Sequence, residues 1–259
     1  MMTFQTKIEI DPEVLRGKYK DDWEAAVVKD LNRVWGSRTG RAVINNILHS
    51  GKTLRIQPYH GTDQNAVTSA ADEKASVFPR YGQMAHDATG HLTVPGTGTG
   101  SNVLIRFTPW RYPEDHLQFL TADQRRVLTS LGIEPATSHS ADGHGHVVAE
   151  SGFHDITILH EMVHALQMTR GADTNKTFPY QFENVSEFDA ILVENIYRSE
   201  TGRYLRGGHI GRPIMTGTTV VTNATDLKNR LDGFRRRNHE LAAQLEGIDT
   251  PFNPLKKTP

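Results

Sequence analysis

Cysteine is absent from this chain of 259 residues. Without thiols the protein has no disulfide framework, no thiolate metal site and no cysteine nucleophile. Any metal ion that it binds must therefore take its ligands from histidine and carboxylate side chains. The sequence is well supplied with both, having 13 histidines and 30 aspartates and glutamates.

A charge excess of either sign is also missing. The 29 lysines and arginines nearly balance the acidic residues, and the formal net charge is −1. A chain with this balance has no overall field that attracts nucleic acid or anionic lipid, so we expect neither as a partner. We therefore expect its function to reside in a local site.

Long hydrophobic runs are lacking as well. No stretch approaches the roughly 20 apolar residues of a membrane span, and the opening MMTFQTKIEIDPE has neither the basic start nor the apolar run of a secretory signal. We therefore expect a soluble protein. Export of such a chain would require a specialised secretion system.

The hydrophobic residues, 37% of the total, are spread along the whole chain as in a globular protein. Periodicity predicts strands over residues 3–10, 53–58 and 102–107. It predicts helices over residues 22–34, 40–48, 155–169 and 186–201, and a final helix over about 226–245 whose Arg235–Arg237 run is interpreted as a solvated face. Residues 59–100 are irregular and end in GTGTG, which is not a phosphate loop because it opens a strand. The expected architecture is one α+β domain with a small mixed sheet.

The segment LHEMVHALQ carries the motif H-E-x-x-H at His160, Glu161 and His164. On a helix the two histidines lie one turn apart on the same face, so their imidazole nitrogens can meet one ion. Glu161 lies beside them and can take a proton from a water on the metal without being a ligand. A chance motif is less favoured, because two histidines and a glutamate among apolar neighbours are costly to bury without a metal. The motif predicts a zinc-dependent hydrolase.

Catalytic zinc usually has three protein ligands and one open position, so a third ligand is expected elsewhere. Glu187, on the helix predicted over residues 186–201, is the first choice. A capping role for Glu187, with Asn184 three residues before it, is the alternative. Glu194 on the same face is either a competing ligand or a partner that orients a ligand histidine.

The segment RYLRGGHIGR follows this helix and is broken by glycines. A cation or hydrogen-bond donor here would stabilise the oxyanion that forms when water attacks a carbonyl group. Arg206 and His209 are the candidates for this role. The alternative is a surface loop whose charges are simply solvated.

Several stretches of the chain together resemble the NleD-like zinc metallopeptidases, a family of bacterial effector and toxin domains. The stretches are SGKTLRI, the glycine-rich entry into SNVLIRFTP, HEMVHALQ, and EFDAILVENIYRSETG followed by RYLR. They span about residues 36–212, which is most of the chain. The E-x-x-A segment at Glu187 and the E-N-x-x-R segment at Glu194 make the resemblance more specific than H-E-x-x-H alone.

The resemblance implies a single zincin-like domain over residues 1–259, with a core of about 36–212 and a C-terminal helix of about 226–245. It implies one Zn²⁺ ion, endopeptidase activity, and delivery from a bacterium into another cell. The implied substrate is a protein of the target cell, since known members cut host signalling proteins that include mitogen-activated protein kinases. Where the family has an arginine and then a tyrosine three residues later, this chain has Arg206 and His209.

Two other functions fit the same residues. One is a metal-dependent amidase or deacylase that acts on a non-protein substrate, because H-E-x-x-H specifies hydrolysis more firmly than it specifies the substrate. The other is a binding module in which zinc is purely structural. A structural site has no use for an uncoordinated carboxylate at Glu161, so this residue distinguishes the module from the enzymes.

Overall fold

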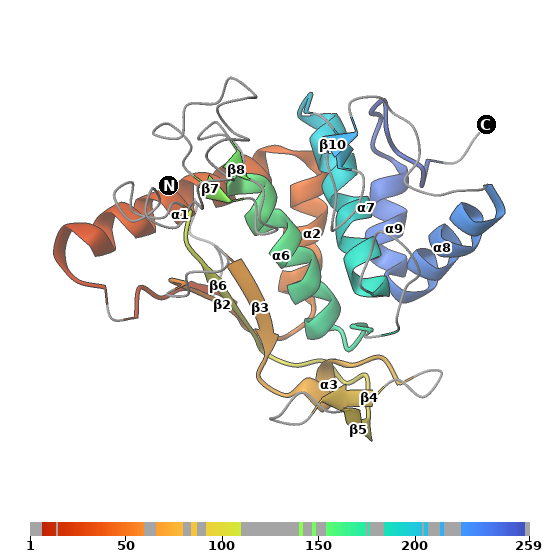
Figure 1. Ribbon diagram of the computed structural model, residues 1–259, viewed down its shortest axis with the longest axis horizontal. Helices are drawn as coiled ribbons and strands as arrows, with labels where there is room; N and C mark the ends of the chain where they lie inside the picture. The colour runs from red at the N-terminus through yellow and green to blue at the C-terminus, as the bar shows by residue number, and fades with distance from the viewer. Residues whose placement is uncertain are drawn as a thin grey trace, which may run out of the picture.

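The computed structural model describes residues 7–13, 15–59, 66–79, 84–86, 92–109, 140–141, 147–148, 154–174, 176, 184–203, 205–206, 213–214 and 224–256. Within these residues the chain forms seven helices and a four-stranded mixed sheet, with three further two-stranded pairs (Figure 1). The prediction of a mixed helix-and-sheet fold with a small mixed sheet is confirmed. No helix in these ranges has the length and apolar character needed to cross a membrane.

The main sheet has the strand order β1-β2-β6-β3. Its strands are β1 (Ile8–Ile10), β2 (Leu54–Gln57), β6 (Val103–Phe107) and β3 (Ala66–Ala70). The first three are parallel, and β3 runs antiparallel to β6 at one edge. Strands β1, β2 and β6 confirm predicted strands, whereas β3 lies in the segment where none was predicted. The short pairs are β4 (Met84–His86) with β5 (Leu92–Pro95), β7 (Ser140–Ala141) with β8 (Val147–Val148), and β9 (Leu205–Arg206) with β10 (Pro213–Ile214).

The helices lie beside this sheet, with α6 at the centre of the molecule (Figure 1). They are α1 (Gly17–Gly36), α2 (Arg38–His49), α3 (Glu73–Ser76), α6 (His154–Thr169), α7 (Val185–Glu200), α8 (Ala224–Arg237) and α9 (His239–Glu246). The helices predicted over residues 22–34, 40–48, 155–169 and 186–201 are thereby confirmed. The short helix α3 was not predicted.

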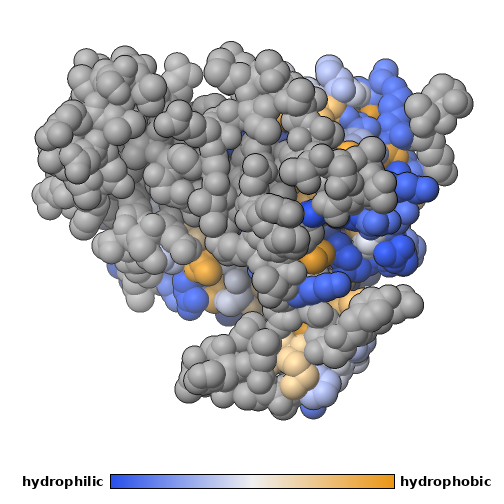
Figure 2. Space-filling model, turned by 45° about the vertical axis from the view of Figure 1, so that its right-hand side comes forward, coloured by the Kyte–Doolittle hydropathy of each residue, from blue (hydrophilic) through white to orange (hydrophobic). Residues whose placement is uncertain are grey.

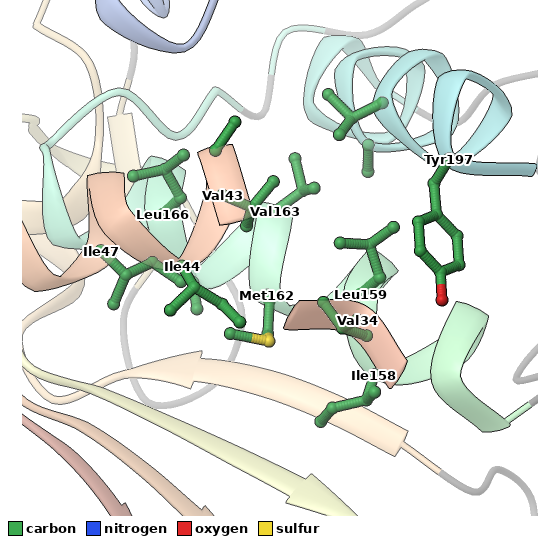
Figure 3. Packing of buried hydrophobic residues seen from close by; sticks show 14 of the residues in the cluster. Val34, Val43, Ile44, Ile47, Ile158, Leu159, Met162, Val163, Leu166 and Tyr197 are labelled. Carbon is green, nitrogen blue, oxygen red and sulfur yellow. The ribbon is translucent and has the colours of Figure 1, made fainter. Parts of the chain in front are cut away.

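Helix α6 is buried on nearly all sides. It packs against α1, α2 and α7 and also against β3 and β6. Figure 3 shows Leu159, Met162 and Val163 of α6 in the same apolar cluster as Val43 and Ile44 of α2. Because apolar residues surround it, α6 holds its polar side chains on a rigid support.

The glycines of GTGTG allow the chain before β6 to approach the end of α6 closely. Gly98 and Gly100 have positive φ angles of 66° and 76°. A Cβ atom on Gly100 would lie 2.1 Å from the carbonyl oxygen of Thr169, a separation that real Cβ atoms do not reach. The Ser101 N–H also donates to the Met168 carbonyl at 3.1 Å. The motif thus fixes the end of α6 and does not bind phosphate through a helix N-terminus.

The predicted C-terminal helix over about 226–245 is wrong in one respect, because it is two helices that meet at Asn238. Asp189 of α7 is fully buried, and hydrogen bonds to it hold this junction against α7. The Arg237 guanidinium donates to both of its carboxylate oxygens at 2.7 and 2.8 Å, and the Asn238 amide donates at 3.2 Å. Arg237 is therefore not part of a solvated face, although the surface around α8 and α9 is largely hydrophilic (Figure 2).

A second buried acidic group joins α1 to the beginning of α6. Asp30 of α1 is buried, and its Oδ2 lies 3.9 Å from Nδ1 of His154 at the start of α6. The neighbouring Asp155 accepts hydrogen bonds from Tyr197 and, at 2.8 Å, from Arg203. Burial, and then the charge of Asp155, raise the pKa of Asp30 to about 7, while Arg33 at 3.6 Å opposes the shift. In the native state Asp30 therefore keeps its proton up to about pH 7. In the unfolded chain, where the Asp pKa is about 4, it loses this proton at lower pH.

This raised pKa predicts that the free energy of unfolding falls as the pH rises from about 4 to about 7. Asp30→Asn should abolish this loss, because asparagine imitates the protonated acid. We expect the variant to match the wild type near pH 4 and to exceed it by about 1–4 kcal/mol at pH 8. Urea unfolding at both pH values measures the difference. Asp22→Asn on the exposed side of α1 is the control, and an equal effect of Asp30→Asn at both pH values would contradict the prediction.

Candidate metal centre

His160 and His164 face Glu187 across the contact between α6 and α7. The Nε2 atoms of the two histidines lie 3.1 Å apart. One Glu187 oxygen lies 3.3 Å from the His160 Nε2, and the other lies 3.3 Å from the His164 Nε2. One donor atom from each residue falls in a group spanning at most 4.8 Å, which is compact enough to hold a metal ion. The three residues predicted as ligands are thus brought together.

The donor atoms suit a metal in both chemistry and spacing. Ligands about 2.0–2.1 Å from a tetrahedral ion are separated from one another by about 3.3 Å, which is close to the separations between Nε2 and carboxylate oxygen seen here. The other ring nitrogen of His160, Nδ1, lies 2.9 Å from Oε2 of Glu194. A proton on Nδ1 can be donated to this carboxylate, which leaves the Nε2 lone pair for the ion.

Glu194 therefore contacts the ring nitrogen of His160 that is not in the three-residue group, and it lies outside the group that could hold an ion. It is almost fully buried, with 1% of its surface exposed. The Arg198 Nε donates to its Oε1 at 2.6 Å, so one carboxylate joins a guanidinium to a ligand imidazole. Of the two roles considered for Glu194, these contacts favour the orienting one.

Glu187 was considered both as a ligand and as part of a helix cap. Its backbone takes part in the cap, and its side chain faces the histidines. Asn184 is the N-cap of α7, and its Oδ1 accepts a hydrogen bond from the Glu187 N–H at 2.9 Å. The Glu187 carboxylate is directed at the histidines. The cap thus fixes the first turn of α7, and this turn places the third ligand.

The pKa of each residue in this group depends on the charges of its neighbours. Burial opposes a positive charge on His164, but the adjacent Glu187 carboxylate outweighs it and raises the pKa of His164 to about 10. In the same way burial would raise the pKa of Glu187, but the positive charge on His164 and hydrogen bonds from both histidines hold it below its usual range. Without a metal the cluster therefore retains a proton, which a metal ion has to displace.

Glu161 lies on α6 beside the ligands but outside their group. Thr68 of β3 donates a hydrogen bond from its hydroxyl to Glu161 Oε2 at 2.6 Å. This contact was not predicted, because β3 spans only Ala66–Ala70 within a segment that has no clear periodicity. The sequence of residues 66–70, AVTSA, does not alternate between apolar and polar residues, so it gave no signal for a strand.

Arg206 and His209 are the residues predicted to stabilise the oxyanion, and the structure does not describe the side chain of either. Arg206 lies in β9, where it pairs with Pro213 of β10. His209 lies outside the described residues. Their proposed role therefore stays a prediction.

No family model, curated protein or solved structure matches this chain. The candidate metal centre therefore rests on the geometry of its own residues. The resemblance to the NleD-like peptidases likewise stays a prediction.

The geometry predicts different effects for the two glutamates on α7. Glu187→Ala removes a ligand and should abolish tight metal binding. Glu194→Ala keeps all three ligands but frees the His160 ring, and should weaken zinc affinity about 10- to 100-fold. Titration against a chromophoric chelator measures both affinities. Glu194→Gln retains a hydrogen-bond acceptor and serves as the conservative control, with a smaller expected loss. Equal losses for Glu187→Ala and Glu194→Ala would contradict this division of roles.

Proposed function

We propose that this chain is a zinc-dependent endopeptidase with a zincin-like domain, and a bacterial effector or toxin that cleaves proteins of a target cell. The observation that carries the proposal is the convergence of His160, His164 and Glu187 beside the uncoordinated carboxylate of Glu161. The sequence resemblance to NleD-like peptidases supplies the effector part of the proposal.

Zinc is the metal that best fits this ligand set. Two imidazole nitrogens and one carboxylate form a mixed nitrogen and oxygen set that zinc accepts readily, with the fourth position left for catalysis. Mg²⁺ and Ca²⁺ instead prefer oxygen ligands and higher coordination numbers. When bound, zinc acts as a Lewis acid that acidifies water and polarises a carbonyl group.

The protein residues supply the proton transfers of amide hydrolysis. Glu161 accepts one proton from the attacking water, whose oxygen forms a bond to the carbonyl carbon. As the carbon–nitrogen bond breaks, Glu161 donates that proton to the leaving amine. No covalent bond to the protein forms at any step, and the lack of cysteine agrees with this route.

The edge strand β3 supports a peptide as the substrate. The Ala71 N–H donates to the Asn102 carbonyl beside β6, so residues 66, 68 and 70 direct their backbone groups to the opposite, outer edge. Among the described strands none pairs with this edge. An extended peptide can add to such an edge through main-chain hydrogen bonds. Since Thr68 contacts Glu161, that peptide would pass close to the base.

Glu161→Gln tests the function while leaving the metal ligands intact. We expect unchanged zinc content and a loss of about 10²- to 10⁴-fold in cleavage rate, because glutamine cannot accept the proton. Zinc is measured by elemental analysis, and cleavage is measured on labelled casein and on whole proteins after expression of each variant in eukaryotic cells.

Other results of this experiment identify the alternatives. Hydrolysis of small amides by the wild type, without cleavage of any protein, would replace the peptidase with an amidase or deacylase. Full function of Glu161→Gln would indicate a binding module with structural zinc. His164→Ala, which should lose both zinc and activity, is the control for metal dependence.

A further inference from the structure

Thr68 is the residue at which the sheet meets the proposed general base. It lies in the middle of β3, opposite Ile105 of β6, and thus on the face of the sheet that packs on α6. Its hydroxyl lies 2.6 Å from Oε2 of Glu161 and 3.3 Å from the Glu161 carbonyl oxygen. Both contacts join the edge strand to one residue of the metal-bearing helix.

The two distances indicate which Glu161 oxygen accepts the hydrogen bond from the Thr68 hydroxyl. A threonine hydroxyl has one proton to donate. The Glu161 backbone carbonyl oxygen is always an acceptor, and Oε2 is an acceptor when the carboxylate is ionised. A separation of 2.6 Å is typical of a hydroxyl bound to a carboxylate, whereas 3.3 Å is long for such a bond. The carboxylate oxygen Oε2 is therefore the principal acceptor.

This bond restricts how the base can be oriented. Glu161 has several rotatable bonds, and a carboxylate that turns freely spends little time with either oxygen in line with a water. In the described part of the chain, Thr68 is the residue that hydrogen-bonds to this carboxylate. With Oε2 held, the other oxygen is left for proton transfer.

We propose that Thr68 is a positioning residue for catalysis, which fixes the Glu161 carboxylate through Oε2 so that Oε1 exchanges the proton with water and with the leaving amine. The inference rests on the proposed hydrolase function. It adds that the strand offered to the substrate also sets the orientation of the base. A displacement of about 1 Å in a catalytic group can cost about 10²-fold in rate, so one hydroxyl is sufficient for a measurable effect.

The chain offers well-matched variants for a test. Thr68→Val removes the hydroxyl while retaining the shape and strand preference of threonine, so the fold should be maintained. Thr68→Ser restores the hydroxyl. Ser69→Ala removes a hydroxyl from the next residue of β3, which is exposed on the opposite face.

The first measurement is kcat and KM for labelled casein with the zinc-loaded full chain. Thr68→Val should lower kcat about 10- to 100-fold with KM and zinc content unchanged. Thr68→Ser should recover most of the loss, and Ser69→Ala should equal the wild type. A wild-type kcat for Thr68→Val, or a loss that Thr68→Ser fails to repair, would overturn the proposal.

The second measurement does not depend on activity. Crystal structures of the zinc-loaded wild type and Thr68→Val should show one Glu161 conformer in the first and a displaced or multiple conformer in the second. If the wild type cleaves no protein, the peptidase proposal fails, and the crystal structures still decide whether Thr68 holds the carboxylate. An identical Glu161 conformer in both proteins would refute the positioning role.

Discussion

The structure depends on the placement of two imidazoles and a carboxylate within hydrogen-bonding distance of one another inside the protein. Such groups are costly to bury unless their charges are balanced. The negative charge of the Glu187 carboxylate raises the pKa of His164, which favours a protonated imidazole that balances this charge when no metal is bound. A divalent cation can replace this proton and satisfy all three donors at once. The polar cluster is thus poorly suited to a simple structural role and well suited to a metal.

Helix α7 connects this centre to much of the remaining structure. Three acidic residues on it are buried or nearly so, and each lies beside positively charged or histidine side chains, with His160 shared by Glu187 and Glu194. Glu187 faces the histidines, Asp189 faces Arg237 at the junction of α8 and α9, and Glu194 joins His160 to Arg198. Asp189 lies two residues from the third ligand, so the C-terminal helices hold the same turn of α7 that presents Glu187. They belong to the support of the metal centre, even though the sequence resemblance ended before them.

What could be predicted from the sequence was mainly what a single helix determines. The pairing of His160 with His164 follows from a spacing of one turn, and Glu187 follows from its place at the start of the next amphipathic helix. The partners of Thr68, Asp189 and Gly100 could not be read in this way, because each lies far along the chain. Strand register and buried ion pairs depend on tertiary packing, and a local pattern of charges such as the Arg235–Arg237 run looks the same whether it is solvated or buried.

The contact between β3 and α6 also bears on why a candidate metal site with this composition lies next to a sheet edge with which none of the described strands pairs. A structural metal site needs neither an uncoordinated glutamate nor an accessible strand edge beside it. A peptidase needs both, since the scissile bond must be presented to the metal and to a proton acceptor in one fixed geometry. Here Thr68 offers its backbone at the outer edge and its side chain to Glu161. In the proposed peptidase, a movement of the strand would therefore shift a bound peptide and Glu161 together, which would keep their relative position nearly constant.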